Sequence, residues 1–307
     1  MKTAKRLKYI EEYYFSRKLK EVGHLISQGK PIINLGIGSP DIMPPKSTVN
    51  SLIEALKSLE AHKYQSYNGI NSLRQAIKSF YFNNYNVDLN HEHEILPLIG
   101  SKEGIMHISL AFLDEADEVL IPNPGYPTYS SVTKIVGAKP IFYDLKESNS
   151  WLPNIKDLEK MNLSKVKIMW VNYPNMPTGS NCSLSFFNDL ISFCEERNIL
   201  LINDNPYSFI LNDNPISLLM ARKSKNCLEL NSLSKSHNMA GWRLGMVVGL
   251  KENIDSILKI KSNMDSGMFF PTQVGAVDAL NQDKNWYKDL NDIYFNRKKI
   301  VVQICKK

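Results

Sequence analysis

The sequence predicts an α/β protein with a three-layer αβα architecture and a mainly parallel central sheet. Short apolar runs rich in Val, Ile and Leu alternate along the chain with segments of helical period. Within each run the apolar residues follow one another and do not alternate with polar ones, which is typical of strands buried on both faces. A length of 307 residues, 43% of them hydrophobic, supplies enough apolar material for one large core and a smaller lobe.

Seven of the apolar runs are predicted to form strands. They are Ile95–Ile99, Glu118–Ile121, Lys139–Tyr143, Val166–Asn172, Ile199–Asn203, Cys227–Leu230 and Met246–Gly249. The predicted helices between them are Ser51–Leu59, Leu73–Phe82, Glu103–Leu113, Thr128–Val136 and Ser185–Arg197. In the last helix, Phe187, Leu190 and Cys194 share one face because they recur at three- and four-residue steps. Parallel sheets bind ligands at the carboxyl ends of their strands, so functional residues are expected directly after these runs.

Two helical segments flank this core. The first 40 residues open with an amphipathic helix and run into Gly36-Ile37-Gly38, and the pattern is helical again from about Asp283 onward. We therefore expect residues 1–45 to form an N-terminal arm and part of a small domain. Residues 46–282 are expected to form the large domain, and 283–307 the start of a small domain that is incomplete in this chain.

Composition excludes several classes of protein. The net charge of +6 arises from 37 basic and 31 acidic residues, with basic clusters only at the two ends of the chain. No interleaved basic and aromatic pattern indicates nucleic-acid binding. The four cysteines lie far apart and His91-Glu92-His93-Glu94 lacks a distant partner, so no metal site is expected. With no signal peptide and no apolar run long enough for a membrane span, we expect a cytoplasmic protein that binds no membrane.

The segment 231–245 carries the strongest chemical pattern. Lys235 is flanked by small hydroxyl residues, which leave room around its amine for a bulky aldehyde. Ser232 and Ser234 can donate hydrogen bonds to phosphate oxygens, and the guanidinium of Arg243 can bind a phosphate in bidentate fashion. The segment therefore indicates a lysine that forms a Schiff base beside a phosphate site.

This segment resembles the cofactor-lysine motif of the class I/II aminotransferases, which are pyridoxal-phosphate enzymes of fold type I. The resemblance extends from about residue 31 to about residue 281. It implies the fold-type I large domain and a ping-pong transfer of an amino group from an amino acid to a 2-oxo acid. It also implies that Lys235 carries pyridoxal 5′-phosphate and then acts as general base and acid.

Further family positions are matched along the chain. A buried strand ends at Asp204, where the family has a carboxylate that pairs with the protonated pyridine nitrogen, and Tyr207 matches the donor to the cofactor's phenolic oxygen. Gly100 opens a predicted helix, whose free backbone N–H groups form an anion site. The resemblance places the cofactor phosphate there, beside Ser101 and Lys102.

Three more positions follow from the same resemblance. Tyr126 matches the aromatic residue that stacks on the pyridine ring, and Gly38 matches a backbone contact to the substrate carboxylate. Tyr64 resembles the tyrosine that reaches the phosphate of the neighbouring subunit. A homodimer with shared active sites is therefore expected.

The chain departs from the family pattern at two places. Met176 stands where the family has an Asn that donates to the phenolic oxygen, and a thioether is no donor. Tyr207 is then the main donor unless Asn172 or Asn175 reaches in, and Asn175 is a candidate cofactor ligand on this ground. In addition, the family's arginine for the substrate carboxylate belongs to a C-terminal lobe that lies beyond the last residue of this chain.

The substrate stays open at this point. Segments such as Lys261–Gly267 are similar to those of the LL-diaminopimelate aminotransferase subgroup. A pyridoxal-phosphate C–S lyase shares the Lys, Asp and Arg positions and is an alternative enzyme. An impaired cofactor-binding or dimerisation remnant is the alternative from another class of protein.

Overall fold

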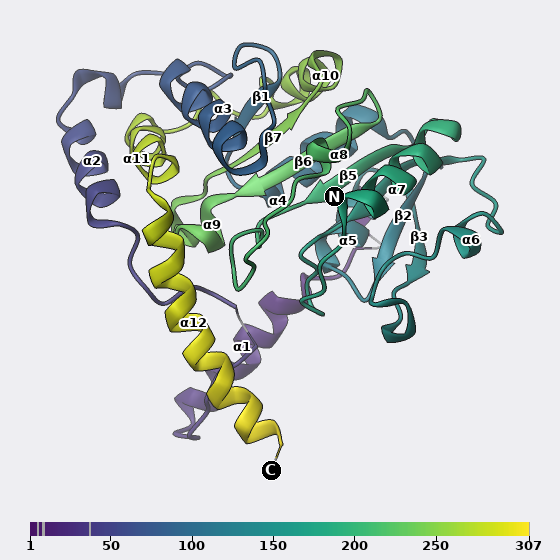
Figure 1. Cartoon of the computed structure of the whole chain (residues 1–307), viewed down its shortest axis with the longest axis horizontal. Helices are drawn as coiled ribbons and strands as arrows, with labels where there is room; N and C mark the ends of the chain where they lie inside the picture. Colours follow the sequence, from purple (N-terminus) through teal and green to yellow (C-terminus); the bar gives the residue numbers. More distant parts are fainter. Residues whose placement is uncertain (5, 8–9, 37, 307) are drawn as a thin grey trace.

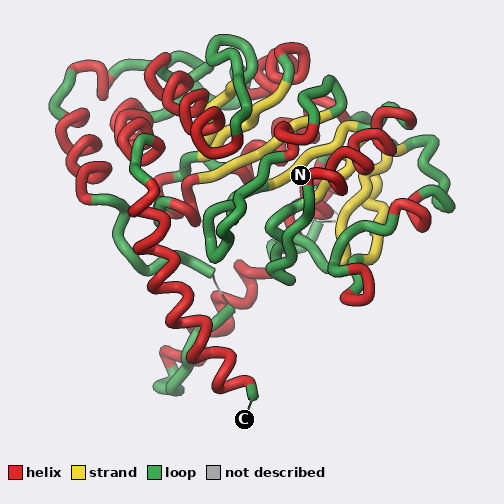
Figure 2. Tube along the Cα trace, in the orientation of Figure 1, coloured by secondary structure: helices red, strands yellow, loops and turns green. Residues whose placement is uncertain are grey.

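A seven-stranded sheet forms the centre of the computed structural model, which describes residues 1–4, 6–7, 10–36 and 38–306. The strands are β1 (Ile95–Leu98), β2 (Glu118–Asn123), β3 (Lys139–Asp144), β4 (Val166–Val171), β5 (Leu200–Asp204), β6 (Cys227–Ser232) and β7 (Gly245–Gly249). Their order across the sheet is β1-β7-β6-β5-β4-β2-β3. All seven runs predicted to be strands are confirmed, with small shifts at their ends (Figure 2).

The sheet is mainly parallel, as predicted. Neighbours from β3 through β2, β4 and β5 to β6 run parallel, whereas β7 is antiparallel to both β6 and β1. Parallel neighbours need a crossover connection, usually a full helix. Only the short α9 (Leu233–Ser236) and one 3₁₀ turn lie between β6 and β7. This connection is too short for a crossover, so β7 runs antiparallel beside β6.

Helices cover both faces of the sheet (Figure 1). One layer contains α4 (Ser101–Phe112), α5 (Pro127–Ile135) and α10 (Lys251–Lys261). The other contains α3 (Asn71–Tyr85), α7 (Leu184–Glu196), α8 (Leu218–Ala221) and α11 (Phe270–Leu280), with α2 (Lys46–Leu56) packed on α11 and α6 (Ile155–Leu158) at the rim. Alternate residues of β4 serve the two cores: Met169 packs on one side, and Ile168 and Trp170 on the other. The predicted three-layer αβα class is confirmed.

Two helices lie outside these layers. α1 (Tyr14–Ser27) has no buried residue, and α12 (Lys284–Cys305) runs away from the sheet (Figure 1). Arg297 of α12 makes a bidentate ion pair with Asp41, with N–O distances of 2.7 and 3.0 Å. Ile37 and the basic residues Lys5, Lys8 and Lys307 lie outside the described part of the chain. Among the residues that are described, no helix is long and apolar enough to cross a bilayer.

Candidate active site

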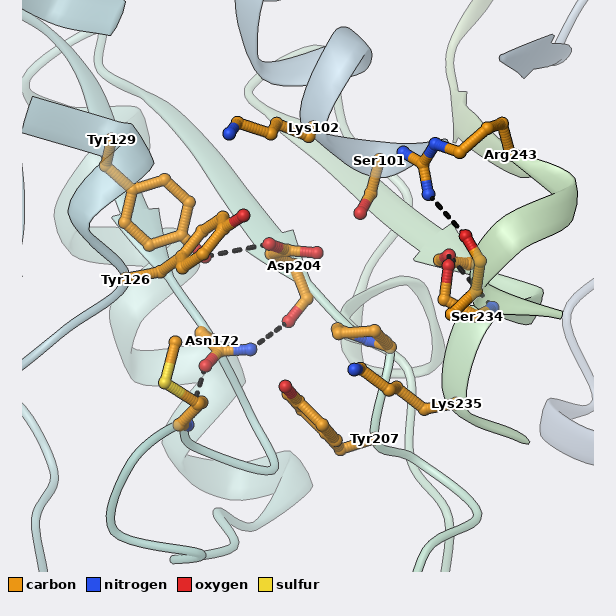
Figure 3. Close-up of a pocket in the computed structure, with 14 residues that line it drawn as sticks. Ser101, Lys102, Tyr126, Tyr129, Asn172, Asp204, Tyr207, Ser234, Lys235 and Arg243 are labelled. Carbon is orange, nitrogen blue, oxygen red and sulfur yellow. Dashed lines mark hydrogen bonds between the residues drawn. The ribbon is translucent and has the colours of Figure 1, made fainter. Parts of the chain in front are cut away.

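A pocket of about 460 Å³ opens at the carboxyl ends of β4, β5 and β6. This is the edge at which the parallel topology predicts ligand binding. Residues singled out from the sequence line much of it: Ser101, Lys102, Tyr126, Asp204, Tyr207, Ser232, Ser234, Lys235 and Arg243. Tyr129, Asn172, Met176, Pro206 and Ala240 complete the lining (Figure 3).

Asp204 is the last residue of β5 and is 4% exposed. Its Oδ2 accepts a hydrogen bond of 2.9 Å from the Tyr129 hydroxyl, whereas its Oδ1 is buried without a partner in the described structure. Burial raises the pKa of Asp204 to about 6, the Tyr129 hydrogen bond opposes this rise, and the charge of Glu229 adds to it. A buried carboxylate oxygen without a donor is costly, so this position favours a cationic or N–H group in the pocket.

Tyr129 is a pocket residue that the sequence analysis did not find. It lies within α5, and its ring stacks on Trp170 of β4 with centroids 5.0 Å apart and planes at 9°. The tyrosine and its acceptor Asp204 are 75 residues apart, so no local motif links them. Tyrosines on buried helix faces are common core residues, so Tyr129 does not stand out in the sequence. Only the packing of α5 on the sheet reveals its hydrogen bond to Asp204.

Lys235 is half-buried in α9, directly after β6. Burial and the nearby charge of Arg243 both lower the pKa of its amine, which increases the neutral, nucleophilic fraction at a given pH. The Lys235 Nζ donates a hydrogen bond to the backbone carbonyl of Gly38. Its amine and the Tyr207 hydroxyl point into the same space on one side of Asp204 (Figure 3).

A candidate anion site lies around Gly100 and Arg243. Ser101 begins α4, and Gly100 before it has a φ of 84°, a left-handed conformation that favours glycine. A Cβ on Gly100 would meet the Arg243 Nη2 at 2.2 Å, so the guanidinium lies directly over this glycine. Ser232 and Ser234 share a hydrogen bond of 2.8 Å on the adjacent turn. This part of the pocket thus combines the backbone N–H groups at the start of α4 with two hydroxyl groups and a guanidinium, all of which can donate to an anion.

Aromatic and cationic groups form one wall. Tyr126 packs edge-on against Tyr129 with centroids 5.6 Å apart, and burial raises the pKa of the Tyr126 hydroxyl well above its usual range. The Nζ of Lys102 lies 3.8 Å from the centroid of the Tyr13 ring. Tyr13 also accepts a hydrogen bond of 3.3 Å from Thr128, so the N-terminal arm reaches this wall. No local sequence pattern marks Tyr13 as part of this wall.

The sequence left open whether Asn172 or Asn175, in the loop after β4, reaches into the pocket as a donor. Asn172 donates to the Asp204 carbonyl at 2.6 Å and accepts from the Met176 N–H at 2.7 Å, so its amide is used in holding the loop. Asn175 accepts from the Thr178 hydroxyl at 2.7 Å and does not line the pocket. Met176 does line it. Tyr207 contributes a hydroxyl group to this side of the pocket, and burial and the charge of Asp204 raise its pKa to about 12.

Tyr64 lies outside this chain's own pocket. Its side chain is 91% exposed, and the neighbouring Tyr67 is 45% exposed. The loop that carries them is held from behind, because the Lys261 Nζ donates to the Tyr67 carbonyl at 3.0 Å and Arg74 donates to the Gly69 carbonyl at 2.6 Å. The exposed aromatic groups are thus presented outward on a well-anchored loop.

Comparison with known proteins places the chain in a family. The model of the family "Aminotransferase class I and II" matches residues 30–307. The LL-diaminopimelate aminotransferase of Aquifex aeolicus is 39% identical over 305 residues, which cover 98% of this chain and 79% of that relative. The corresponding enzyme of Natranaerobius thermophilus is also 39% identical, over all of this chain and 80% of its own length.

Solved structures agree with this placement. Apo-BacF from Bacillus subtilis superposes with a TM-score of 0.94 at 33% identity, covering 100% of this chain and 79% of that one. An aminotransferase from Staphylococcus aureus gives 0.89 at 28% identity, covering 99% and 79%. The chain therefore belongs to the class I and II aminotransferases, the pyridoxal-phosphate-dependent enzymes that move an amino group between an amino acid and a 2-oxo acid.

Proposed function

We propose that this pocket binds pyridoxal 5′-phosphate and that Lys235 is the residue that carries it. The observation that supports this most is the buried Oδ1 of Asp204, which has no partner among the described residues and faces a pocket with a lysine amine on one side. A protonated pyridine nitrogen is the cationic donor that such an oxygen favours. Above a pH of about 6, Asp204 is ionised and able to hold that proton in place.

The remaining groups fit the rest of the cofactor. The start of α4 with Ser101, together with Ser232, Ser234 and Arg243, would hold the phosphate. Lys102 follows Ser101 in α4, also lines the pocket, and is the second cation that we propose for this role. Tyr126 would lie against the ring, and Tyr207 would donate to the phenolic oxygen.

The chemistry divides between cofactor and protein. When bound, pyridoxal phosphate supplies an aldehyde that condenses with an amine and a ring that withdraws electrons from the amino acid's α-carbon. Asp204 keeps the ring nitrogen protonated, which strengthens that withdrawal. The Lys235 Nζ, whose pKa is lowered by burial, takes the proton from the α-carbon as a general base. Gly38, whose carbonyl accepts from the Lys235 amine, would lie beside the substrate carboxylate.

LL-diaminopimelate is the amino-acid substrate that we propose. The support comes from relatives at 39% identity over nearly the whole chain, which carry this substrate in their names. We also propose a homodimer in which Tyr64 reaches the partner's phosphate site, since its side chain is 91% exposed on an anchored loop. Light scattering that gives the mass of a single chain would contradict the dimer.

The visible absorbance of the lysine–cofactor adduct tests the cofactor assignment. Purified protein incubated with pyridoxal phosphate should show the band, and borohydride should fix the cofactor to Lys235, as peptide mass spectrometry would reveal. Lys235→Ala should lose both signals. Lys251→Ala is the matched control and should keep them, because Lys251 is an exposed residue at the start of α10.

The substrate is tested by adding amino acids to the loaded protein. LL-diaminopimelate should abolish the band faster than alanine, aspartate or aromatic amino acids, and a 2-oxo acid should restore it. Wild-type protein without a band would refute the cofactor assignment. A band that responds equally to every amino acid would refute the substrate alone.

A further inference from the structure

The turn that follows Tyr207 is held by a residue of α12. Asn291 uses both ends of its amide: its Nδ2 donates to the Phe209 carbonyl at 2.9 Å, and its Oδ1 accepts from the Leu211 N–H at 2.8 Å. Within the turn itself, the Ile210 N–H donates to the Tyr207 carbonyl at 3.0 Å. One side chain therefore closes the turn directly behind a pocket residue.

This turn needs an external support. Leu211 has a φ of 49°, in the left-handed region that non-glycine residues rarely adopt. Leu211 itself is 39% exposed. Such a conformation persists when surrounding contacts fix it, and the two hydrogen bonds to Asn291 are contacts of this kind.

The same helix also contacts the segment that follows Lys235. The indole Nε1 of Trp286 donates to the Ser236 carbonyl at 2.9 Å. The Tyr287 hydroxyl lies 3.0 Å from the His237 Nε2, and burial lowers the pKa of His237 to about 3, so the imidazole is neutral. The Tyr287 ring stacks on Phe209 with centroids 4.6 Å apart. The first turns of α12 thus join the two segments that carry Lys235 and Tyr207.

We propose that Asn291 is a positioning residue. Through the turn at 209–211, it fixes the position of the Tyr207 hydroxyl relative to the Lys235 amine. The proposal rests on the assignment of the pocket to pyridoxal phosphate, because Tyr207 acts on that cofactor's phenolic oxygen. Asn291 itself does not line the pocket, so it acts only through Tyr207.

Hydrogen exchange of the cofactor-free protein tests the structural half. Asn291→Ala should increase amide exchange across the peptide that contains Ile210 and Leu211, since the Leu211 N–H loses its acceptor. Exchange in β5 should not change. Lys288→Ala is the matched control on α12, because Lys288 is exposed and forms an ion pair with Asp292 on the same helix.

A pH titration of the absorbance band tests the functional half. The unprotonated adduct carries more negative charge on the phenolic oxygen, so a donor to that oxygen lowers the midpoint. Asn291→Ala loosens the donor and should raise the midpoint by about 0.5 to 1 pH unit, the scale of a weakened hydrogen bond. Lys288→Ala should leave it at the wild-type value.

A double-mutant cycle with Tyr207→Phe separates positioning from a general loss of structure. If Asn291 acts through the Tyr207 hydroxyl, Asn291→Ala should shift the midpoint in the wild-type background and not in the Tyr207→Phe background. Asn291→Asp, which keeps the acceptor for Leu211, serves if the alanine variant does not fold. An unchanged midpoint, or an equal shift with and without the hydroxyl, would overturn the proposal. A wild-type protein without a band would instead refute the cofactor assignment, and the exchange result would still stand.

Discussion

Replacing Asp204 by Asn should stabilise the cofactor-free protein while weakening cofactor binding. Burial raises the pKa of Asp204 to about 6 from an ordinary value of 3.8, so folding favours the protonated carboxyl. Between these pH values the native state binds more protons than the unfolded chain, and the free energy of unfolding therefore falls as the pH rises. The full cost of burying the charge corresponds to about 3 kcal/mol above pH 7.

The neutral amide of Asn avoids that cost. The free energy of unfolding of Asp204→Asn should exceed that of the wild type by up to about 3 kcal/mol at pH 8 and by about half as much at pH 5. The variant keeps an oxygen to accept from Tyr129. Affinity for pyridoxal phosphate should fall, because the ionic partner of the ring nitrogen is lost.

Urea unfolding of both cofactor-free proteins, at one protein concentration and at pH 5 and 8, gives the difference directly. Asp157→Asn on α6 is the control, since this exposed carboxylate has its pKa lowered by Lys160 and should give no gain in stability. The reasoning is refuted if Asp204→Asn is no more stable than the wild type at pH 8, or if its advantage is the same at both pH values.

Two further substitutions test the two ends of the pocket. Gly100→Ala should weaken pyridoxal phosphate binding at least tenfold in a fluorescence titration, because its Cβ would lie 2.2 Å from the Arg243 Nη2 at a φ of 84°; unchanged affinity would show that Arg243 does not serve the phosphate. Met176→Asn should restore a donor on the Tyr207 side and lower the pH midpoint of the absorbance band by about 1 unit; a midpoint that stays or rises would show that this position does not reach the phenolic oxygen.

Local sequence patterns were sufficient for the sheet. Most strands are apolar runs that are buried on both faces, whereas the edge strand β3 is only partly buried and still contains the apolar pair Ile141 and Phe142; all seven were predictable. Besides the four-residue helices α6, α8 and α9, the prediction omitted two longer helices, α10 and α11, which differ in their sequence signal. α10 has the usual apolar spacing at Ile254 and Ile257 and could have been found. α11 is apolar over much of its circumference because it is buried between α2 and α3, and such a helix loses its periodic signal.

In the candidate site, too, some residues could be predicted from local sequence and others could not. Lys235, Asp204 and the turn at Gly100 stand at the ends of strands, in short motifs whose chemistry can be read locally. The partners that set their properties cannot be read in this way: Tyr129 is 75 residues from Asp204, and Asn291 is 80 residues from Leu211.

The sequence by itself therefore determined the fold class and the family, and it indicated the residues that we propose as cofactor ligands. The tertiary structure alone decided that one carboxylate oxygen of Asp204 is buried without a partner among the described residues. It also decided that the Asn172 amide bonds the Asp204 carbonyl and the Met176 N–H, and that α12 supports the Tyr207 turn. The physical reason is that burial, and with it the pKa of a carboxyl or an amine, depends on all the chain segments that pack around a group.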